Sequence, residues 1–212
     1  HVRRWWFWIS AVAIILLIGI SRIFLAVHFP ADVIVGFAVG AGTLLGFLAL
    51  EGPVGRRIAR LPLSGQVFVA LAGSLALALV SVSALATLGD WQAPASWAAG
   101  ALERSGQPIA PLSLRDAATA SGLLFGFAAG AAVAWPKRGG MCAVGKWSVR
   151  LLRYVSGILV TGAIWFGFGL LIPKDPGLTA FALLYIQAAA AGAWVSFGAP
   201  AAFAYLNLAD RS

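Results

Sequence analysis

Six apolar runs without a charged side chain constrain the fold of this chain more than any other feature. They lie at about residues 5–20, 33–50, 66–88, 117–135, 154–172 and 178–206. A run near 20 residues is long enough to cross the hydrocarbon core of a bilayer as an α-helix, and a helix satisfies its own backbone polar groups there. We therefore expect an all-α, polytopic membrane bundle of about six helices. Pro200 should kink or end the last one.

The composition agrees with a membrane protein and excludes a soluble domain. Of the 212 residues, 61% are hydrophobic and 10% are charged, which leaves too little polar surface to cover a soluble core. The net charge of +8 does not indicate nucleic-acid binding, because no basic stripe alternates with exposed aromatic residues. The single cysteine, Cys142, allows neither an intrachain disulfide nor a Cys-based metal site.

The basic residues predict the orientation of the helices. With six spans both termini lie on one side, and most Lys and Arg residues fall on that side: Arg3, Arg4, Arg56, Arg57, Arg60, Lys137, Arg138, Lys146, Arg150, Arg153 and Arg211. Arg22, Arg104, Arg115 and Lys174 fall on the other. Because cytoplasmic ends carry the excess of basic residues, we expect cytoplasmic termini and an outward-facing turn after the first span. The membrane would be a plasma membrane such as the bacterial inner membrane.

That first turn combines an arginine, one of the two histidines and an aspartate. Ionisable residues at the mouth of a membrane span are costly and therefore usually functional. Arg22 can grip phosphate oxygens with its planar fork, His28 offers a nucleophilic nitrogen, and Asp32 could orient that ring. Pro30 suits the first position of the next helix, so the free N–H groups of this helix would form an anion site beside His28.

Each of these residues also has a purely structural explanation. An arginine at a helix end often anchors at the interface, an aspartate near a helix start is often a cap, and a lone histidine is usually a satisfied polar residue. The combination of residue types and spacings, rather than any one residue, favours chemistry.

The pattern Ser-Arg, five residues, His, three residues, Asp resembles the third signature of the type 2 phosphatidic acid phosphatase family. The flanking Pro30, Val33 and Gly36 agree with that signature. The resemblance covers about residues 5–50, and one departure is Ala26, where the family commonly has glycine.

The resemblance implies a role for each residue of the pattern. His28 would attack the phosphorus and form a phosphohistidine, Asp32 would position His28, and Arg22 with Ser21 would bind the phosphoryl group. No metal or other cofactor would be required. The substrate would be a lipid phosphate or diphosphate, and an outward-facing site would suit an isoprenoid carrier diphosphate or a phosphatidate-like lipid.

Two further signatures of this family, K-x6-R-P and Pro-Ser-Gly-His, do not occur in the sequence. They supply cations for the transferring phosphoryl and an acid for the leaving oxygen. The chain also starts at His1 rather than Met. We therefore interpret residues 1–50 as the C-terminal part of a catalytic core and residues 51–212 as an additional transmembrane region of unknown role. We expect the chain alone to be inactive.

The alternative is a non-catalytic membrane bundle that transports or scaffolds and retains a relic signature. The sequence upstream of His1 would distinguish the two, because an enzyme requires the missing pair of signatures. Membrane lipids are expected partners in both cases, whereas neither the particular lipid nor the oligomeric state can be predicted.

Two other patterns suggest local structure. In the long connection at 89–116, residues 96–105 predict a short interfacial helix anchored by Trp97, either a lid over the site or a loop without a chemical role. Ser113 with Asp116 resembles a capping box. Glycines four apart, Gly36 and Gly40 in one span and Gly126 and Gly130 in another, predict close helix packing, and the shared G-F-A-x-G-A is a faint sign of duplication.

Overall fold

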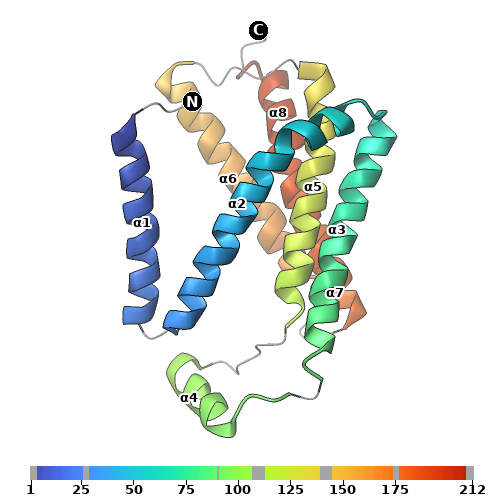
Figure 1. Cartoon of the computed structure of the whole chain (residues 1–212). Helices are drawn as coiled ribbons and strands as arrows, with labels where there is room; N and C mark the ends of the chain where they lie inside the picture. Colours follow the sequence, from blue (N-terminus) through green and yellow to red (C-terminus); the bar gives the residue numbers. More distant parts are fainter. Residues whose placement is uncertain are drawn as a thin grey trace. The chain divides into compact units, whose positions relative to one another are not determined.

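The computed structural model describes residues 4–25, 29–89, 91–106, 113–138, 145–173 and 177–208, and every regular element within them is helical. The helices, drawn in Figure 1, are α1 (Trp5–Phe24), α2 (Pro30–Ala59), α3 (Leu63–Ala86), α4 (Ala95–Ser105), α5 (Arg115–Arg138), α6 (Trp147–Gly169), α7 (Leu178–Ala193), the π-helix η1 (Trp194–Gly198) and α8 (Ala199–Tyr205).

The predicted all-α membrane bundle is confirmed. Six helical stretches of the described residues are long and apolar enough to cross a membrane: Trp5–Phe24, Pro30–Ala59, Leu63–Ala86, Arg115–Ala134, Trp147–Gly169 and Leu178–Tyr205. They correspond one for one to the six apolar runs. The helices α7, η1 and α8 follow one another without a break and together form the last span.

Two helices extend beyond the runs that predict them. The run at 33–50 stops before Glu51, but α2 continues through Pro53 to Ala59, and Figure 1 shows its axis turning in this C-terminal part. Likewise, α6 begins at Trp147, two turns before the run at 154–172. Apolar run length measures the part of a helix that lies in hydrocarbon, whereas a helix can continue past that region with charged residues. A helix-interior proline is a common cause of such a change in axis.

The chain forms two compact units, His1–Arg60 and Leu61–Ser212. The first unit is a hairpin of α1 and α2, which run in opposite directions (Figure 1). Gly19 is the buried residue of α1, and a Cβ added there would lie 2.5 Å from Cζ of Phe37 and 3.0 Å from Cγ1 of Val33. The two helices therefore pack closely against each other at Gly19, about one turn before the end of α1.

In the second unit the tightest packing joins α5 and α7. A Cβ added to Gly122 or Gly126 of α5 would collide with the backbone of Tyr185 or Ala189 of α7, and one added to Gly192 of α7 would lie 2.7 Å from the carbonyl oxygen of Leu123. Small residues thus let the two backbones approach closely, as in other membrane helix pairs.

Buried polar groups connect α7 to its other neighbours. The Tyr185 hydroxyl and Ser74 Oγ of α3 are 2.6 Å apart. Gln187 is 3% exposed, and its Nε2 donates to the backbone carbonyl of Trp165 in α6. A buried amide without a partner would be costly, so this hydrogen bond gives Gln187 a role in helix packing.

The predicted disturbance at Pro200 takes the form of a π-turn rather than a helix end. The Ala199 N–H donates to the carbonyl of Trp194, five residues back, and α8 then continues through Pro200 to Tyr205. An extra residue in a turn accommodates the proline ring and its missing N–H without stopping the helix. Near the start of α5, Ser113 Oγ accepts from the Arg115 N–H at 3.2 Å and so satisfies one free N–H group of this helix end, whereas the predicted capping box would join Ser113 to Asp116.

Candidate active site

The residues of the candidate site lie around the turn of the α1–α2 hairpin. Ser21 and Arg22 belong to the last turn of α1, and Pro30 and Asp32 belong to the first turn of α2. Ala26, Val27 and His28 lie outside the described residues. The structure thus brings the flanking members of the pattern to one end of one hairpin, and the position of His28 in the chain is between them.

Asp32 caps α2. Its Oδ2 accepts a hydrogen bond of 3.0 Å from the backbone N–H of Phe29, the residue that precedes the helix. Pro30 stands at the first helical position, where its missing N–H costs nothing. The negative charge of Asp32 also interacts favourably with the positive end of the helix dipole. Asp32 therefore has the capping role that its position near a helix start suggested as a purely structural explanation.

Capping by Asp32 does not exclude a role beside His28. A carboxylate has about four acceptor positions on its two oxygens, so it can accept further hydrogen bonds beside the one from Phe29. Phe29 also follows His28 directly in the chain. The hydrogen bond that the Phe29 N–H donates to Asp32 therefore fixes the backbone immediately after the histidine.

The guanidinium of Arg22 is exposed and makes no hydrogen bond or ion pair with another described residue. Its position in the last turn of α1 is favourable for a cation, because the helix dipole is negative there. Ser21 is also exposed, and its hydroxyl donates to the carbonyl of Ile18 at 2.7 Å. The serine oxygen keeps its capacity to accept, whereas its proton is already engaged with the helix backbone.

Large apolar side chains lie close to these polar residues in the chain. Phe24, Leu25 and Phe29 are all exposed, as is most of the surface of α1 and α2. An exposed apolar surface of this kind is suited to contact with lipid or other membrane helices. The candidate site therefore combines a cation and a carboxylate with an apolar surround.

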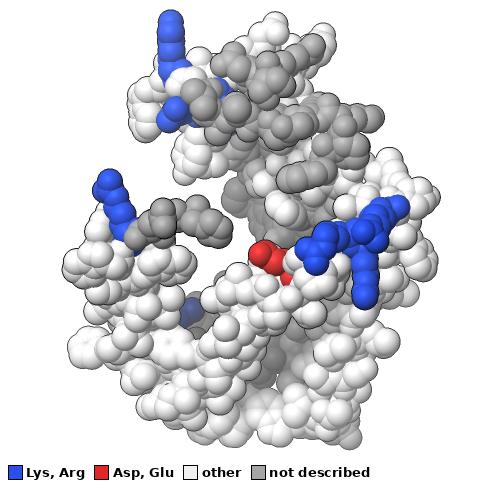
Figure 2. Space-filling model, turned by 45° about the horizontal axis from the view of Figure 1, so that its top comes forward, with Lys and Arg blue, Asp and Glu red and all other residues white. Residues whose placement is uncertain are grey.

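The opposite end of the hairpin is basic. Arg4 precedes α1, Arg56 and Arg57 lie in the last turn of α2, and Arg60 follows it. Figure 2 shows that basic side chains gather in separate groups on the face drawn and that most of the remaining described surface is uncharged. In this unit the charges expected on the cytoplasmic side thus lie at the end away from Arg22 and Asp32.

Sequence reasoning did not identify Gly19 as a residue that positions the site. Gly19 lies three residues before Arg22, and its contact with Val33 and Phe37 fixes how α1 meets α2. A glycine within an apolar run is a weak signal of close helix approach.

Among the described residues, no three His, Cys, Asp or Glu side chains are grouped in a way that would hold a metal ion.

Two family models match the chain. The model of the PAP2 superfamily matches residues 1–55, which include Ser21, Arg22, His28 and Asp32. The model described as the PAP2 superfamily phosphatase, transmembrane extension, matches residues 118–211, which include most of α5 and all of α6, α7 and α8. No match is found among curated proteins or among solved structures. Because both models name one superfamily and lie in separate parts of the chain, this integral membrane protein belongs to the PAP2 superfamily of phosphatases.

Proposed function

We propose that the enzyme to which this chain belongs removes a phosphate group from a lipid phosphate or diphosphate through a phosphohistidine at His28. The observation that carries this proposal is the hairpin that holds Arg22 in the last turn of α1 and Asp32 in the first turn of α2, on either side of His28 in the sequence. The family matches support a membrane phosphatase, and the apolar surround of the turn favours a substrate with an apolar tail.

The proposed reaction has two steps. A ring nitrogen of His28 attacks the phosphorus, and the bond from phosphorus to the lipid oxygen breaks as the leaving oxygen takes a proton from a general acid. Water then attacks the phosphohistidine, which releases inorganic phosphate and frees the histidine. The acid and additional cations correspond to the two signatures that do not occur in this sequence.

Arg22 and Asp32 have different tasks in this reaction. The Arg22 guanidinium binds two phosphoryl oxygens and stabilises the charge that develops on them, with Ser21 Oγ as a neighbouring polar group. Asp32 orients the imidazole and stabilises its positive charge in the phosphohistidine, by analogy with the carboxylate of a catalytic triad. Its hydrogen bond to Phe29 supports this task, because it holds the backbone next to His28.

The domain organisation and orientation follow from the same proposal. Residues 1–50 complete the catalytic core, and residues 51–212 add further membrane helices to it. The hairpin turn faces the outside of a plasma membrane and the termini face the cytoplasm, because basic residues flank the other end of the hairpin. From that side the site would reach an isoprenoid carrier diphosphate or a phosphatidate-like lipid.

The experiment replaces His28 with Ala in the intact parent protein and measures phosphate release from lipid phosphates in detergent. We expect no turnover above background from His28→Ala, because the nucleophile is lost. His1→Ala is the matched control, because His1 is the other histidine of the chain and lies outside the signature. A folded His28→Ala protein that releases phosphate at the wild-type rate would exclude the phosphohistidine mechanism and favour a relic signature.

Two further variants separate the roles of the flanking residues. Arg22→Lys should lower turnover strongly, because an ammonium cannot reproduce the two-pronged contact of a guanidinium. Asp32→Asn should retain partial activity and near-normal stability, because an amide oxygen can still accept from the Phe29 N–H. Asp32→Ala loses both the cap and the charge, so its stability should also fall by about 1 kcal/mol. Equal activity in Asp32→Asn and the wild type would show that the charge is not required.

A further inference from the structure

The helix α4 (Ala95–Ser105) lies in the connection between two membrane-spanning helices, α3 and α5. It has 11 residues, about half the number that a helix needs to cross a bilayer. Figure 1 shows α4 at the end of the second unit where α3 ends and α5 begins. Both ends of α4 are thus connected to helices that enter the membrane from the same side.

The two faces of α4 differ in polarity. At helical spacing, Ala98 and Leu102, four residues apart, lie on one face, Trp97 lies at the edge of that face, and Ser96 and Glu103 lie on the other side of the helix. Trp97 is 54% exposed and Leu102 is 55% exposed. The described protein therefore leaves both of these large apolar side chains uncovered.

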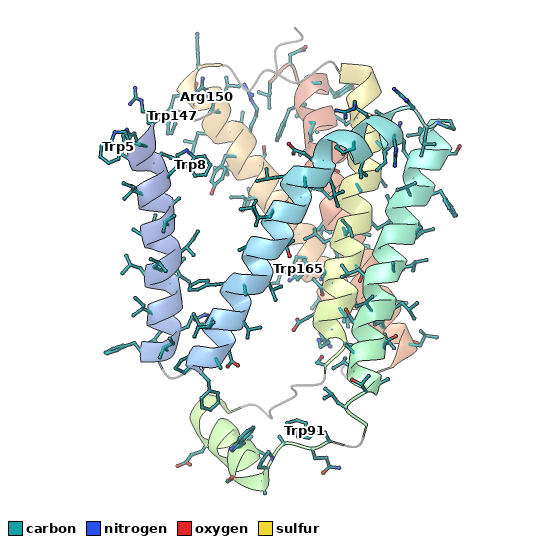
Figure 3. The ribbon with its side chains drawn as sticks, in the orientation of Figure 1. Trp5, Trp8, Trp91, Trp147, Arg150 and Trp165 are labelled. Carbon is teal, nitrogen blue, oxygen red and sulfur yellow. The ribbon has the colours of Figure 1, made fainter. Side chains whose placement is uncertain are left out.

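The ends of α4 also fit a helix that lies beside the membrane. Gly106 follows α4 with a left-handed φ of 67° and donates its N–H to the carbonyl of Leu102 at 2.9 Å, which stops the helix after three turns. Trp91, labelled in Figure 3, lies between α3 and α4 and is exposed. Tryptophan is enriched where hydrocarbon meets the head groups, so two such residues follow the end of α3.

We propose that α4 lies flat in the interfacial layer of the bilayer, with Trp97, Ala98 and Leu102 in contact with lipid and Glu103 facing water. The partner is the lipid surface, because α3 and α5 place that surface next to both ends of α4 and because an amphipathic helix with a tryptophan beside its apolar face inserts there to a depth of about 5–10 Å. The proposal depends on the membrane location of the chain and not on its catalytic activity.

The test measures which face of α4 meets lipid. Single cysteines replace Ala98 and Glu103 in a Cys142→Ala background, which removes the native cysteine of the chain. The 212-residue protein is spin-labelled and reconstituted into liposomes, and the accessibility of each label to oxygen and to a water-soluble nickel complex is measured. Ala98→Cys and Glu103→Cys are matched because they lie on opposite faces of one short helix.

We expect the label at position 98 to be accessible to oxygen and the label at position 103 to be accessible to the nickel complex, with ratios that differ several-fold. If both labels are equally accessible to nickel, α4 lies in water and the proposal is wrong. If the label at position 98 is immobilised and protected from both reagents, the apolar face packs on protein, as a lid over the site would, and the proposal is also wrong.

Discussion

The contact between α5 and α7 predicts that a single methyl group at Gly126 will destabilise the second unit. A Cβ at this position would lie 2.6 Å from the carbonyl carbon of Ala189 and 2.7 Å from its Cα, and it would also collide with the carbonyl oxygen. These are backbone atoms, so no side-chain rotation relieves the overlap. The two helices must separate, and this separation loosens the packing along their length.

The size of the effect follows from these distances. Carbon atoms in contact prefer a separation of about 3.5 Å or more, so the backbones must move apart by about 1 Å. Such a gap removes about a quarter to a half of the dispersion energy between the facing atoms, and overpacking of this kind costs about 1–3 kcal/mol. The alanine regains up to about 1 kcal/mol through helix propensity. Gly73 of α3 is the matched control, because a Cβ there meets no atom within 4 Å.

The assay unfolds each protein by adding sodium dodecyl sulfate to dodecylmaltoside micelles and follows helix content by circular dichroism. Gly73→Ala should be as stable as the wild type or slightly more stable. Gly126→Ala should be less stable than Gly73→Ala by about 1–3 kcal/mol, since the gain in propensity is common to both. If the two variants unfold at the same detergent fraction, the close approach of α5 and α7 does not exist in solution.

Three other predictions concern activity, topology and packing. The 212-residue chain alone should release little or no phosphate from lipid phosphates, because it lacks the acid and cations of the missing signatures; robust turnover would contradict this. A cysteine placed at Ser105 in a Cys142→Ala background should react with an impermeant thiol reagent outside intact cells, whereas native Cys142 should react only after permeabilisation. The reverse pattern would invert the proposed orientation. A double-mutant cycle of Ser74→Ala and Tyr185→Phe should give a coupling of about 0.5–1.5 kcal/mol from their hydrogen bond, and a coupling of zero would show that the hydroxyl groups do not interact.

The number of spans was predictable from the sequence, but the ends of the helices were not. A charge-free run reports where hydrocarbon surrounds the chain, because a charge inside the bilayer is costly. That constraint ends at the head groups, so nothing in the run indicates that α2 continues past Glu51 and Pro53 to Ala59, or that α6 starts at Trp147. The local turn chemistry was more informative. Pro30 at a first helical position was predicted from residue type, and Ser113 does bind the start of α5, although through Arg115 rather than through the predicted pairing with Asp116.

Glycine patterns show the limit of such reasoning most clearly. Gly36 and Gly40 of α2 have the same spacing as Gly126 and Gly130 of α5. A Cβ at either position of α2 meets nothing within 4 Å, whereas one at either position of α5 collides with an atom of α7 or η1. Small residues make a close approach possible, but the choice of partner depends on contacts between segments far apart in the sequence. The spacing of the glycines therefore predicts a helix face lined by small residues, but it does not predict which helix packs against that face.

The chemistry and the stability of this chain depend on different residues. The candidate site lies in a hairpin with little buried surface: Gly19 is the buried residue of α1, and the described part of α2 has no buried residue. In the second unit, by contrast, the buried side chains include Leu184, Gln187 and Ala188 of α7. A polar group at an exposed helix end can be replaced at little cost in packing energy, while a change between α5 and α7 disturbs backbone contacts. Variants at His28, Arg22 or Asp32 should therefore act mainly on turnover, and Gly126→Ala should act mainly on stability. A loss of activity that accompanies a normal detergent midpoint can then be assigned to chemistry rather than to folding.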